Sequence, residues 1–332
     1  MSNKDELISA QLEVIRAMTE KNMKSVGADL FGAPSISNKS EEIKEEAKKE
    51  TQAEEMAEKA EKEDIEALKK ELSEYIGLEK VKSEVSSLIN LATVYALRLK
   101  NDLPTPEMSL HLVFSGNPGT GKTMIARFMA RVYHSLGLLS KGQLVEVDRS
   151  SLVAGYVGQT AQKTMKALES ALGGVLFIDE AYSLTSRSEN DYGLEAVETI
   201  LKYMEDHRDD IVVIIAGYSD LMKDFIDSNP GLQSRFNKYI DFEDYTPEEM
   251  LDIFKMNCRK GRYDLDADAE ATLLSYFCEK ALDSADFGNA RGVRNTFEKI
   301  LSAQANRIAH MTNVSKDDLI RLTKEDAENG VK

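Results

Sequence analysis

The chain has 332 residues, of which 58 are acidic and 42 basic, so its formal net charge is −16. This charge repels nucleic-acid phosphates and argues against nucleic acid as the main partner. Hydrophobic residues make up 42% of the chain, enough for a packed core, and the length predicts about two domains with extensions. No apolar run approaches the roughly 20 residues that span a bilayer, and the two distant cysteines fit a reduced, cytoplasmic protein.

Residues 1–31 begin the chain with the pattern of an amphipathic helix. Within residues 5–24, apolar side chains recur at helical spacing on one stripe, formed by Leu7, Ile8, Leu12, Ile15 and Met18. Two interpretations fit this stripe. The helix docks on a partner, or it packs on the body of its own chain or of a neighbouring subunit.

Residues 32–74 form an acidic, Glu/Lys-rich linker or helix. Lys39–Glu74 contains 14 acidic and 8 basic residues with few apolar ones, a composition typical of a solvated helix or a disordered tether. No apolar heptad is sustained, so the pattern does not favour a coiled coil. An apolar stripe is present only near the end of the segment, at Ile65, Leu68, Leu72 and Ile76.

Residues 75–245 alternate apolar strands with helical patterns, which predicts an α/β domain with three layers. Unbroken apolar runs such as 211–216 indicate strands that are covered on both faces, as in a parallel sheet. The predicted strands, in chain order, are 110–115, 143–147, 175–178, 211–216 and 239–242.

The segment Gly116–Thr123, GNPGTGKT, fits the P-loop (Walker A) pattern G-x-x-x-x-G-K-[ST] at every fixed position. It lies between an apolar strand and a helical stretch, the context in which glycine-rich backbone N–H groups and a helix N-terminus cradle phosphate. In this pattern Lys122 reaches the β- and γ-phosphates of a nucleotide, and the Thr123 hydroxyl ligates Mg²⁺. The residues predicted to contact nucleotide here are Asn117, Pro118, Gly119, Thr120, Gly121, Lys122, Thr123 and Met124.

A second motif, Val175–Glu180, is an apolar strand that ends in two carboxylates. After a P-loop, such a strand is a Walker B element, in which Asp179 is predicted to hold Mg²⁺ directly or through water. Glu180 is predicted to polarise the attacking water. Because a carboxylate beside the metal ligand is placed to activate water, the pair favours hydrolysis over nucleotide binding alone.

Residues 246–332 contain no clear strand and are predicted to form a small all-helical domain. Thr246 is expected to cap its first helix, with Pro247 at the first helical position and Glu249 three residues after the cap. Further helices are predicted by periodicity at 267–282 and 289–310, with a short one at 316–322.

Together these motifs resemble an AAA+ ATPase, and the amino-acid sequences of several segments resemble the CbbX/SpoVK-like (CbxX/CfqX) family. The similarity covers residues 72–325, and the segments that carry it are Leu110–Phe114, Gly155–Thr160, Gly173–Tyr182 and Asn229–Phe236. The resemblance implies an AAA+ P-loop three-layer sandwich with a five-stranded parallel sheet, followed by a helical lid domain. It also implies ATP and Mg²⁺ as ligands and ATP-dependent remodelling of a protein substrate of unknown identity. The expected assembly is a homo-oligomer, a hexameric ring.

The resemblance also implies roles for single residues. Ile76 and Gly77 look like the segment that lines the adenine pocket. Arg235 occupies the position of an arginine finger, which reaches the γ-phosphate bound by the neighbouring subunit; a surface arginine is the alternative interpretation. Arg291 resembles a sensor-2 arginine that contacts the phosphates in cis, with Arg294 as the alternative.

Two loops carry further expectations from the resemblance. Tyr156-Val157-Gly158 resembles the pore loop with which hexameric remodellers grip a polypeptide, since tyrosine offers a large amphipathic contact and glycine lets a loop move. The alternative is a buried tyrosine beside a turn. The sensor-1 position after strand 211–216 departs from the usual asparagine, and Tyr218 and Ser219 both fit the role of orienting water.

Other functions compete with ATP-driven remodelling of a protein. A nucleic-acid-linked AAA+ ATPase, of the clamp-loader or helicase-loader type, needs a basic face, which conflicts with the acidic net charge. A nucleotide-gated scaffold with slow turnover conflicts with the presence of Glu180 and Arg235. Within the family, a Rubisco-activase-like remodeller is a further alternative.

Overall fold

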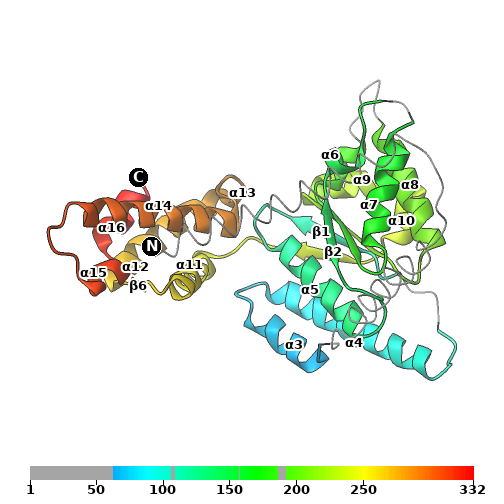
Figure 1. The fold of residues 1–332 in the computed structure, drawn as a ribbon, viewed down its shortest axis with the longest axis horizontal. Coiled ribbons are helices and arrows are strands. Elements are labelled where there is room, and N and C mark those ends of the chain that lie inside the picture. Colours follow the sequence, from blue (N-terminus) through cyan, green and yellow to red (C-terminus); the bar gives the residue numbers. More distant parts are fainter. Residues whose placement is uncertain (1–62, 106–108, 157, 186–191) are drawn as a thin grey trace, which may run out of the picture. The chain divides into compact units, whose positions relative to one another are not determined.

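The computed structural model describes residues 63–105, 109–156, 158–185 and 192–332. The predicted N-terminal helix, most of the acidic segment and Val157 lie outside the described residues. Figure 1 shows the described part, in which helices flank the strands of a sheet. Within this part, no helix is both long enough and apolar enough to cross a membrane.

Five parallel strands form the central sheet, in the order β2-β3-β4-β1-β5. Neighbouring residues of a strand are buried on opposite faces: Phe114 packs in one core cluster and Val113 in the other, and Ile214 and Val213 divide in the same way. Burial on both faces explains why β3 and β4, whose residues are all buried, are continuous apolar runs in the sequence. The strands are β1 (Leu112–Gly116), β2 (Leu144–Val147), β3 (Val175–Ile178), β4 (Val212–Gly217) and β5 (Tyr239–Phe242).

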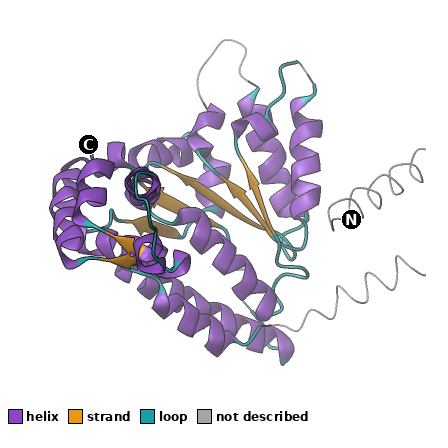
Figure 2. Ribbon diagram, turned by 60° about the vertical axis from the view of Figure 1, so that its left-hand side comes forward, coloured by secondary structure: helices purple, strands orange, loops and turns teal. Residues whose placement is uncertain are grey.

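Helices cover both faces of the sheet, so the predicted three-layer sandwich is confirmed (Figure 2). One layer contains α3 (Ile65–Glu74), α4 (Glu79–Lys100) and α5 (Lys122–Ser135). The other contains α6 (Arg149–Leu152), α7 (Thr160–Ala171), a 3-10 turn (Ala181–Thr185), α8 (Gly193–Asp206), α9 (Ser219–Asp227) and α10 (Pro230–Arg235).

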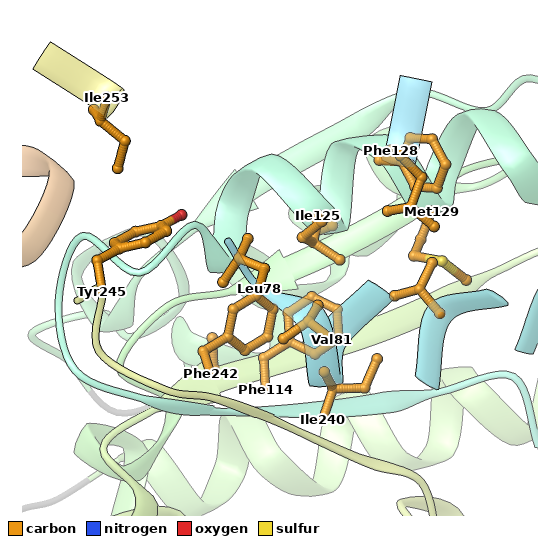
Figure 3. Packing of buried hydrophobic residues seen from close by; sticks show 14 of the residues in the cluster. Leu78, Val81, Phe114, Ile125, Phe128, Met129, Ile240, Phe242, Tyr245 and Ile253 are labelled. Carbon is orange, nitrogen blue, oxygen red and sulfur yellow. The ribbon is translucent and has the colours of Figure 1, made fainter. Parts of the chain in front are cut away.

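An apolar contact between α4, α5 and the sheet holds the helix that follows the P-loop. Figure 3 shows Leu78 and Val81, at the start of α4, among Ile125 of α5, Phe114 of β1 and Phe242 of β5. The ring centroids of Phe114 and Phe242 lie 5.1 Å apart. Burial of each such side chain contributes about 1.5–3 kcal/mol, so this contact fixes the N-terminal half of α5 against the sheet.

The C-terminal end of the acidic segment is not a solvated tether. Residues 65–74 form α3, whose Leu68 and Leu72 are buried in the core shared with α4 and α5. Arg131 of α5 donates to the carboxylates of Glu63 and Glu71, which adds an ionic contact to the apolar one. For these residues the structure has the helix of the two alternatives, but the helix is not solvated on all sides, because its apolar stripe is covered by other helices.

The residues after β5 form a helical lid, in which two short strands pair. The prediction that this region lacks strands was wrong, because Asp264 pairs with Arg321 and Leu265 with Leu322 in a parallel ladder. Two-residue strands are too short to produce the alternation that marks a strand in a sequence. The lid elements are α11 (Pro247–Gly261), β6 (Asp264–Leu265), α12 (Ala267–Lys280), a 3-10 turn (Ala281–Asp283), α13 (Ser284–Phe287), α14 (Asn289–Ala309), α15 (Lys316–Ile320), β7 (Arg321–Leu322) and α16 (Lys324–Gly330).

The first lid helix begins where the sequence predicts. Thr246 Oγ1 accepts a hydrogen bond from the Glu249 N–H at 3.2 Å, and Glu249 Oε2 accepts one from the Thr246 N–H at 2.8 Å. Pro247 takes the first helical position, where its missing N–H costs nothing. This capping box fixes the point at which the chain leaves the sheet and enters the lid.

Candidate active site

A pocket of about 650 Å³ lies at the carboxyl edge of the sheet, where ligands of open α/β sheets bind. Its walls come from the P-loop and the start of α5, from the residues after β3 and β4, and from the lid. The lining residues that the sequence singles out are Ile76, Gly116, Pro118, Gly119, Gly121, Lys122, Thr123, Met124, Asp179, Glu180, Tyr218, Arg291 and Arg294.

The P-loop turns sharply between β1 and α5 around its glycines. Gly121 caps α5 with φ +100°, and Gly119 has φ +74°. A Cβ at Gly119 would lie 2.1 Å from the carbonyl oxygen of Gly288 in the lid, so only glycine fits there. The first residues of α5 line the pocket, and a helix N-terminus offers unpaired backbone N–H groups to an anion.

Lys122 is held by the loop that it follows. Its ammonium donates to the carbonyl oxygens of Gly116 at 2.8 Å and Asn117 at 2.7 Å. Burial lowers the pKa of this ammonium, whereas the nearby Asp179 carboxylate acts to raise it. A partly desolvated ammonium gains strongly from phosphate oxygens, because hydrogen bonds between charged groups are the stronger ones.

Asp179 and Glu180 follow directly on β3, all of whose residues are buried. The Asp179 N–H donates to the Val147 carbonyl at 2.9 Å, and Asp179 Oδ1 accepts from the Glu180 N–H at 3.0 Å. Glu180 has φ +49°, a left-handed conformation that costs a non-glycine residue on the order of 1–3 kcal/mol. Such strain is typical of functional sites, and here it falls on a carboxylate residue that lines the pocket.

The oxygen donors of the pocket fit Mg²⁺. Thr123 and Asp179 both line the pocket. Their hydroxyl and carboxylate oxygens are ligands that Mg²⁺ prefers. Because Mg²⁺ in nucleotide enzymes is usually bound by one or two protein side chains together with substrate phosphates, two donors suffice.

The lid forms one wall of the pocket, and the sequence reasoning missed most of that wall. Ile253, Met256, Asn257 and Lys260 line the pocket from α11. Their i, i+3, i+4, i+7 spacing places them on one helix face and is visible in the sequence. What this face covers is not visible there, because it depends on how the lid packs. Further lining residues that were not predicted are Glu74, Tyr75, Gly217, Tyr245 and Ala290.

Three residues predicted to contact nucleotide are not among those that line the pocket. Thr120 is fully buried, and its hydroxyl donates to the Asn117 carbonyl at 2.8 Å. The Asn117 side chain donates to both carboxylate oxygens of Asp244, at 2.9 and 3.0 Å. Gly77 lies against the lid, since a Cβ there would be 2.4 Å from Glu249 Oε1.

The two sensor-1 alternatives lie differently. Tyr218 lines the pocket, and its ring centroid is 6.1 Å from that of Tyr182. Ser219 begins α9, and its hydroxyl donates to Asp241 Oδ1 at 3.3 Å. Of the two, only Tyr218 lines the pocket.

Arg235 and Tyr156 do not line the pocket of their own chain. Arg235, the last residue of α10, donates to Glu205 Oε2 at 3.0 Å. Tyr156 is 74% exposed, so the interpretation as a buried tyrosine was wrong. A Cβ at Gly158 would meet nothing within 4 Å, and Val157 lies outside the described residues. Tyr156 is therefore available to contact another molecule.

Comparison with known proteins identifies relatives along most of the chain. The family model described as "ATPase family associated with various cellular activities (AAA)" matches residues 112–244, and the AAA lid domain model matches residues 246–331. A CfxQ homolog of Galdieria sulphuraria is 45% identical over 239 residues, which cover 71% of this chain and 78% of the relative. The chloroplastic ribulose bisphosphate carboxylase/oxygenase activase of Cyanidioschyzon merolae is also 45% identical, over 71% of this chain and 81% of the relative. Stage V sporulation protein K of Bacillus subtilis is 41% identical over 71% of this chain and 76% of its own length.

Solved structures show the same fold at much lower sequence identity. The AAA domain of FIGL-1 in complex with ADP has a TM-score of 0.54 and 21% identity, covering 77% of this chain and 82% of that one. A RuvB mutant of Thermotoga maritima has a TM-score of 0.53 and 18% identity, covering 78% of this chain and 71% of that one. With its P-loop, its Asp179-Glu180 strand and its lid on one pocket, the chain belongs to the AAA ATPase family, in the group that contains CfxQ and stage V sporulation protein K.

Proposed function

We propose that this ATPase is a protein remodeller, which hydrolyses ATP to ADP and phosphate and uses the free energy to change the conformation of a protein substrate. The observation that carries the proposal is that Lys122, Asp179 and Glu180, from two separate motifs, line one pocket together with the lid. Because the α/β domain and the lid both line this pocket, the ATP-bound and ADP-bound states can each favour a different lid position.

The residues of the pocket divide the work of hydrolysis. The P-loop N–H groups and Lys122 bind the β- and γ-phosphates. Glu180 accepts a proton from the water that attacks the γ-phosphorus, while the bond from that phosphorus to the β–γ bridging oxygen breaks and ADP leaves. Thr123 and Asp179 would hold Mg²⁺, which supplies charge neutralisation at the phosphates. Tyr218 is the better placed candidate for orienting the water.

Two arginines complete the site from different subunits. Arg291 lines the pocket of its own chain, in keeping with a contact to the phosphates in cis, and Arg294 lies one turn further along α14. Arg235 pairs with Glu205 outside this pocket, which suits a finger that reaches the nucleotide of a neighbouring subunit. A finger in trans requires an oligomer, and a head-to-tail interface repeated around an axis closes into a ring. We infer a ring of about six subunits from the family.

The loop that contains Tyr156 is proposed to grip the substrate. The exposed tyrosine provides a large amphipathic surface that loses little entropy on contact. In a ring, the six copies of this loop would surround one channel, so that movement of the lids pulls on a bound polypeptide. The net charge of −16 disfavours a nucleic-acid substrate and the loader-type alternative.

The substrate is a protein whose identity the chain does not encode in a recognisable motif. One relative is named as a ribulose bisphosphate carboxylase/oxygenase activase, so a Rubisco is one candidate substrate. Both cysteines are unpaired, which fits a reducing compartment and a cytoplasmic protein.

The decisive experiment traps the substrate with Glu180→Gln in the presence of ATP, with and without residues 1–74. The variant should bind ATP, stay in the ATP state and retain substrate, because it lacks only the group that activates water. A captured protein counts as substrate if it stimulates the ATP turnover of the wild type and loses its folded conformation only when ATP is hydrolysed. Tyr156→Ala should lower this remodelling far more than ATP turnover. Retained hydrolysis by Glu180→Gln, or stimulation by nucleic acid but by no protein, would overturn the proposal.

A further inference from the structure

Asp244 lies at the centre of a hydrogen-bond network that joins the P-loop to the lid. It is in the short connection between β5 and α11. Its two carboxylate oxygens accept from the Asn117 side-chain amide at 2.9 and 3.0 Å. Its Oδ1 also accepts from the Asn289 side-chain amide at 2.8 Å. One carboxylate thus bridges the second residue of the P-loop and the first residue of α14.

Asn289 is built into this position. Its side chain is completely buried and its φ is +51°, a conformation that asparagine tolerates better than most residues. Its Oδ1 accepts from the Tyr245 N–H at 3.0 Å, and its amide also donates to the Pro118 carbonyl at 3.3 Å. A buried polar side chain is favourable only when its groups are paired, so Asn289 constrains the lid, the β5–α11 connection and the P-loop at the same time.

The lid also sets the orientation of P-loop peptides. The Asn289 amide engages the Pro118 carbonyl, and the Ala290 N–H donates to the Gly119 carbonyl at 3.2 Å. In a trans peptide the carbonyl and the following N–H point in opposite directions. With their carbonyls turned toward the lid, the peptides after Pro118 and Gly119 direct their N–H groups away from it. The orientation of these donors therefore depends on where the lid sits.

We propose that Asn117, Asp244 and Asn289 form a polar clamp, in which Asp244 is a positioning residue that ties the orientation of the lid to the conformation of the P-loop. The polar clamp rests on the ATP site proposed above, but not on the remodelling of a protein. When phosphate occupies the P-loop, the loop settles around it and the network carries that change to α14. Movement of the lid conversely changes how well the loop binds phosphate, because coupling between two sites is reciprocal.

Asp244 suits this role because of its chemistry. A carboxylate has acceptor capacity for several donors at once, and hydrogen bonds to a charged group are stronger than those between neutral groups. The same carboxylate acts to raise the pKa of the Lys122 ammonium. The segment between β5 and α11 therefore interacts with the P-loop in two ways, through the charge of Asp244 near Lys122 and through its hydrogen bonds from Asn117.

The first test compares ATP binding by Asp244→Ala with that of Glu243→Gln. Glu243 is the residue before Asp244, and its side chain pairs with Lys80 of α4 instead of with the lid. Glu243→Gln therefore removes one negative charge, as Asp244→Ala does, without affecting the contacts to the lid. Asp244→Ala loses the charge-assisted contacts to Asn117 and Asn289, so we expect it to weaken ATP binding about tenfold or more. The ATP affinity of Glu243→Gln should stay within about twofold of the wild type. Titration calorimetry measures both affinities. Failure of the wild type to bind ATP would instead overturn the ATP site itself.

The second test measures the position of the lid. Cys278 on α12 is exposed, and a second label site is provided by Lys166→Cys on the exposed surface of α7. Burial raises the pKa of the Cys258 thiol to about 12, so Cys258 remains protonated and reacts slowly. Labelled subunits are diluted with unlabelled Cys278→Ser subunits, and pulsed electron spin resonance then gives the distance distribution between the two labels within a chain.

With the wild-type Asp244, the polar clamp predicts a narrow distribution of label-to-label distances, and ATP or ADP should shift it. In Asp244→Ala the distance distribution should be broad, and nucleotide should not shift it. It also predicts that Asn117→Ala and Asn289→Ala are non-additive in ATP affinity when Asp244 is present and additive in the Asp244→Ala background. If Asn289→Ala fails to fold, the pair Asn117→Ala and Asp244→Ala provides the same cycle. Wild-type affinity and a wild-type distance shift in Asp244→Ala, or equal effects of Glu243→Gln, would overturn the polar clamp.

Discussion

Lys122 and Glu180 line one pocket but depend on different features of the chain. Lys122 is placed by the P-loop, whose carbonyls accept from its ammonium at 2.7 and 2.8 Å. Glu180 is placed by the end of β3 and by a strained backbone with φ +49°. Loss of Lys122 should therefore remove the binding of phosphates, whereas loss of Glu180 should leave binding and stop turnover.

Lys122→Ala should weaken ATP binding by at least about tenfold to a hundredfold, because hydrogen bonds to charged groups are each worth about 1.5–3 kcal/mol. Titration with a fluorescent ATP analogue measures the affinity. Lys166→Ala, on the exposed surface of α7, is the matched control and should bind like the wild type. ATP binding by Lys122→Ala at wild-type affinity would exclude Gly116–Thr123 as the phosphate site.

At the scale of elements, a contact between segments that are distant in the sequence joins the neighbouring strands β1 and β4. His111, just before β1, accepts the Val213 N–H of β4 on Nδ1 at 3.0 Å and packs against Phe236. Burial lowers the pKa of the His111 imidazole to about 4, and the charges of Arg235 and Lys238 act in the same direction. The imidazole is therefore neutral in the folded chain near pH 7 and serves as an acceptor within the sheet.

His111 should make the stability of the fold depend on pH. The folded pKa of about 4 lies below the ordinary 6.5, so the unfolded chain binds the proton more readily and stability falls as the pH drops from 6.5 toward 4. Between pH 7 and pH 5 the loss from this residue is about 2 kcal/mol.

His111→Asn keeps an acceptor near the position of Nδ1 and removes the titration. Urea unfolding at pH 5 and pH 7 should show that the variant loses less stability than the wild type over this interval. An equal loss in both proteins would mean that other groups cause the acid sensitivity.

The packing of α3 gives a prediction about the end of the acidic segment. Leu72 is 2% exposed, so Leu72→Ala should lower the free energy of unfolding by about 2–5 kcal/mol. Leu91→Ala, at a leucine of α4 that is 46% exposed, is the control and should cost less than about 1 kcal/mol. Equal effects of the two variants in urea unfolding would argue that α3 does not belong to the core.

At the scale of the whole molecule, the proposed arginine finger Arg235 does not line the pocket of its own chain and pairs with Glu205 instead. The site is therefore proposed to be completed by a neighbouring subunit. In the proposed ring, head-to-tail contacts would bring the Arg235 of one subunit beside the Lys122 and Glu180 of the next.

Mixed rings test this arrangement. Arg235→Ala subunits keep an intact pocket, and Glu180→Gln subunits keep an intact finger, so each protein alone should turn over ATP slowly. In a random equal mixture, about a quarter of the interfaces combine an intact pocket with an intact finger, and turnover should recover to about that fraction of the wild type. Native mass spectrometry verifies that the subunits mix. Absence of recovery in verified mixed assemblies would place the action of Arg235 in its own subunit.

The sequence by itself determined the parts of this protein whose signal is local. The P-loop needs a fixed spacing of glycines, lysine and threonine, and the strand before Asp179 is a continuous apolar run, so both were predictable from a few neighbouring residues. The central strands β3 and β4 followed from runs of the same kind, because strands that are buried on both faces have no polar alternation. The capping box at Thr246 is likewise contained in four residues.

Only the tertiary structure decided which distant segments meet. The Asn117–Asp244–Asn289 contacts, the pairing of β6 with β7, and the pocket face of α11 join residues far apart in the chain. Periodicity identifies the face of a helix that is apolar but not the surface that covers it, which is why the sequence did not show that α3 is packed in the core. These contacts depend on the packing of the lid and of α3 on the sheet, since a hydrogen bond between remote groups leaves no regular spacing in the sequence.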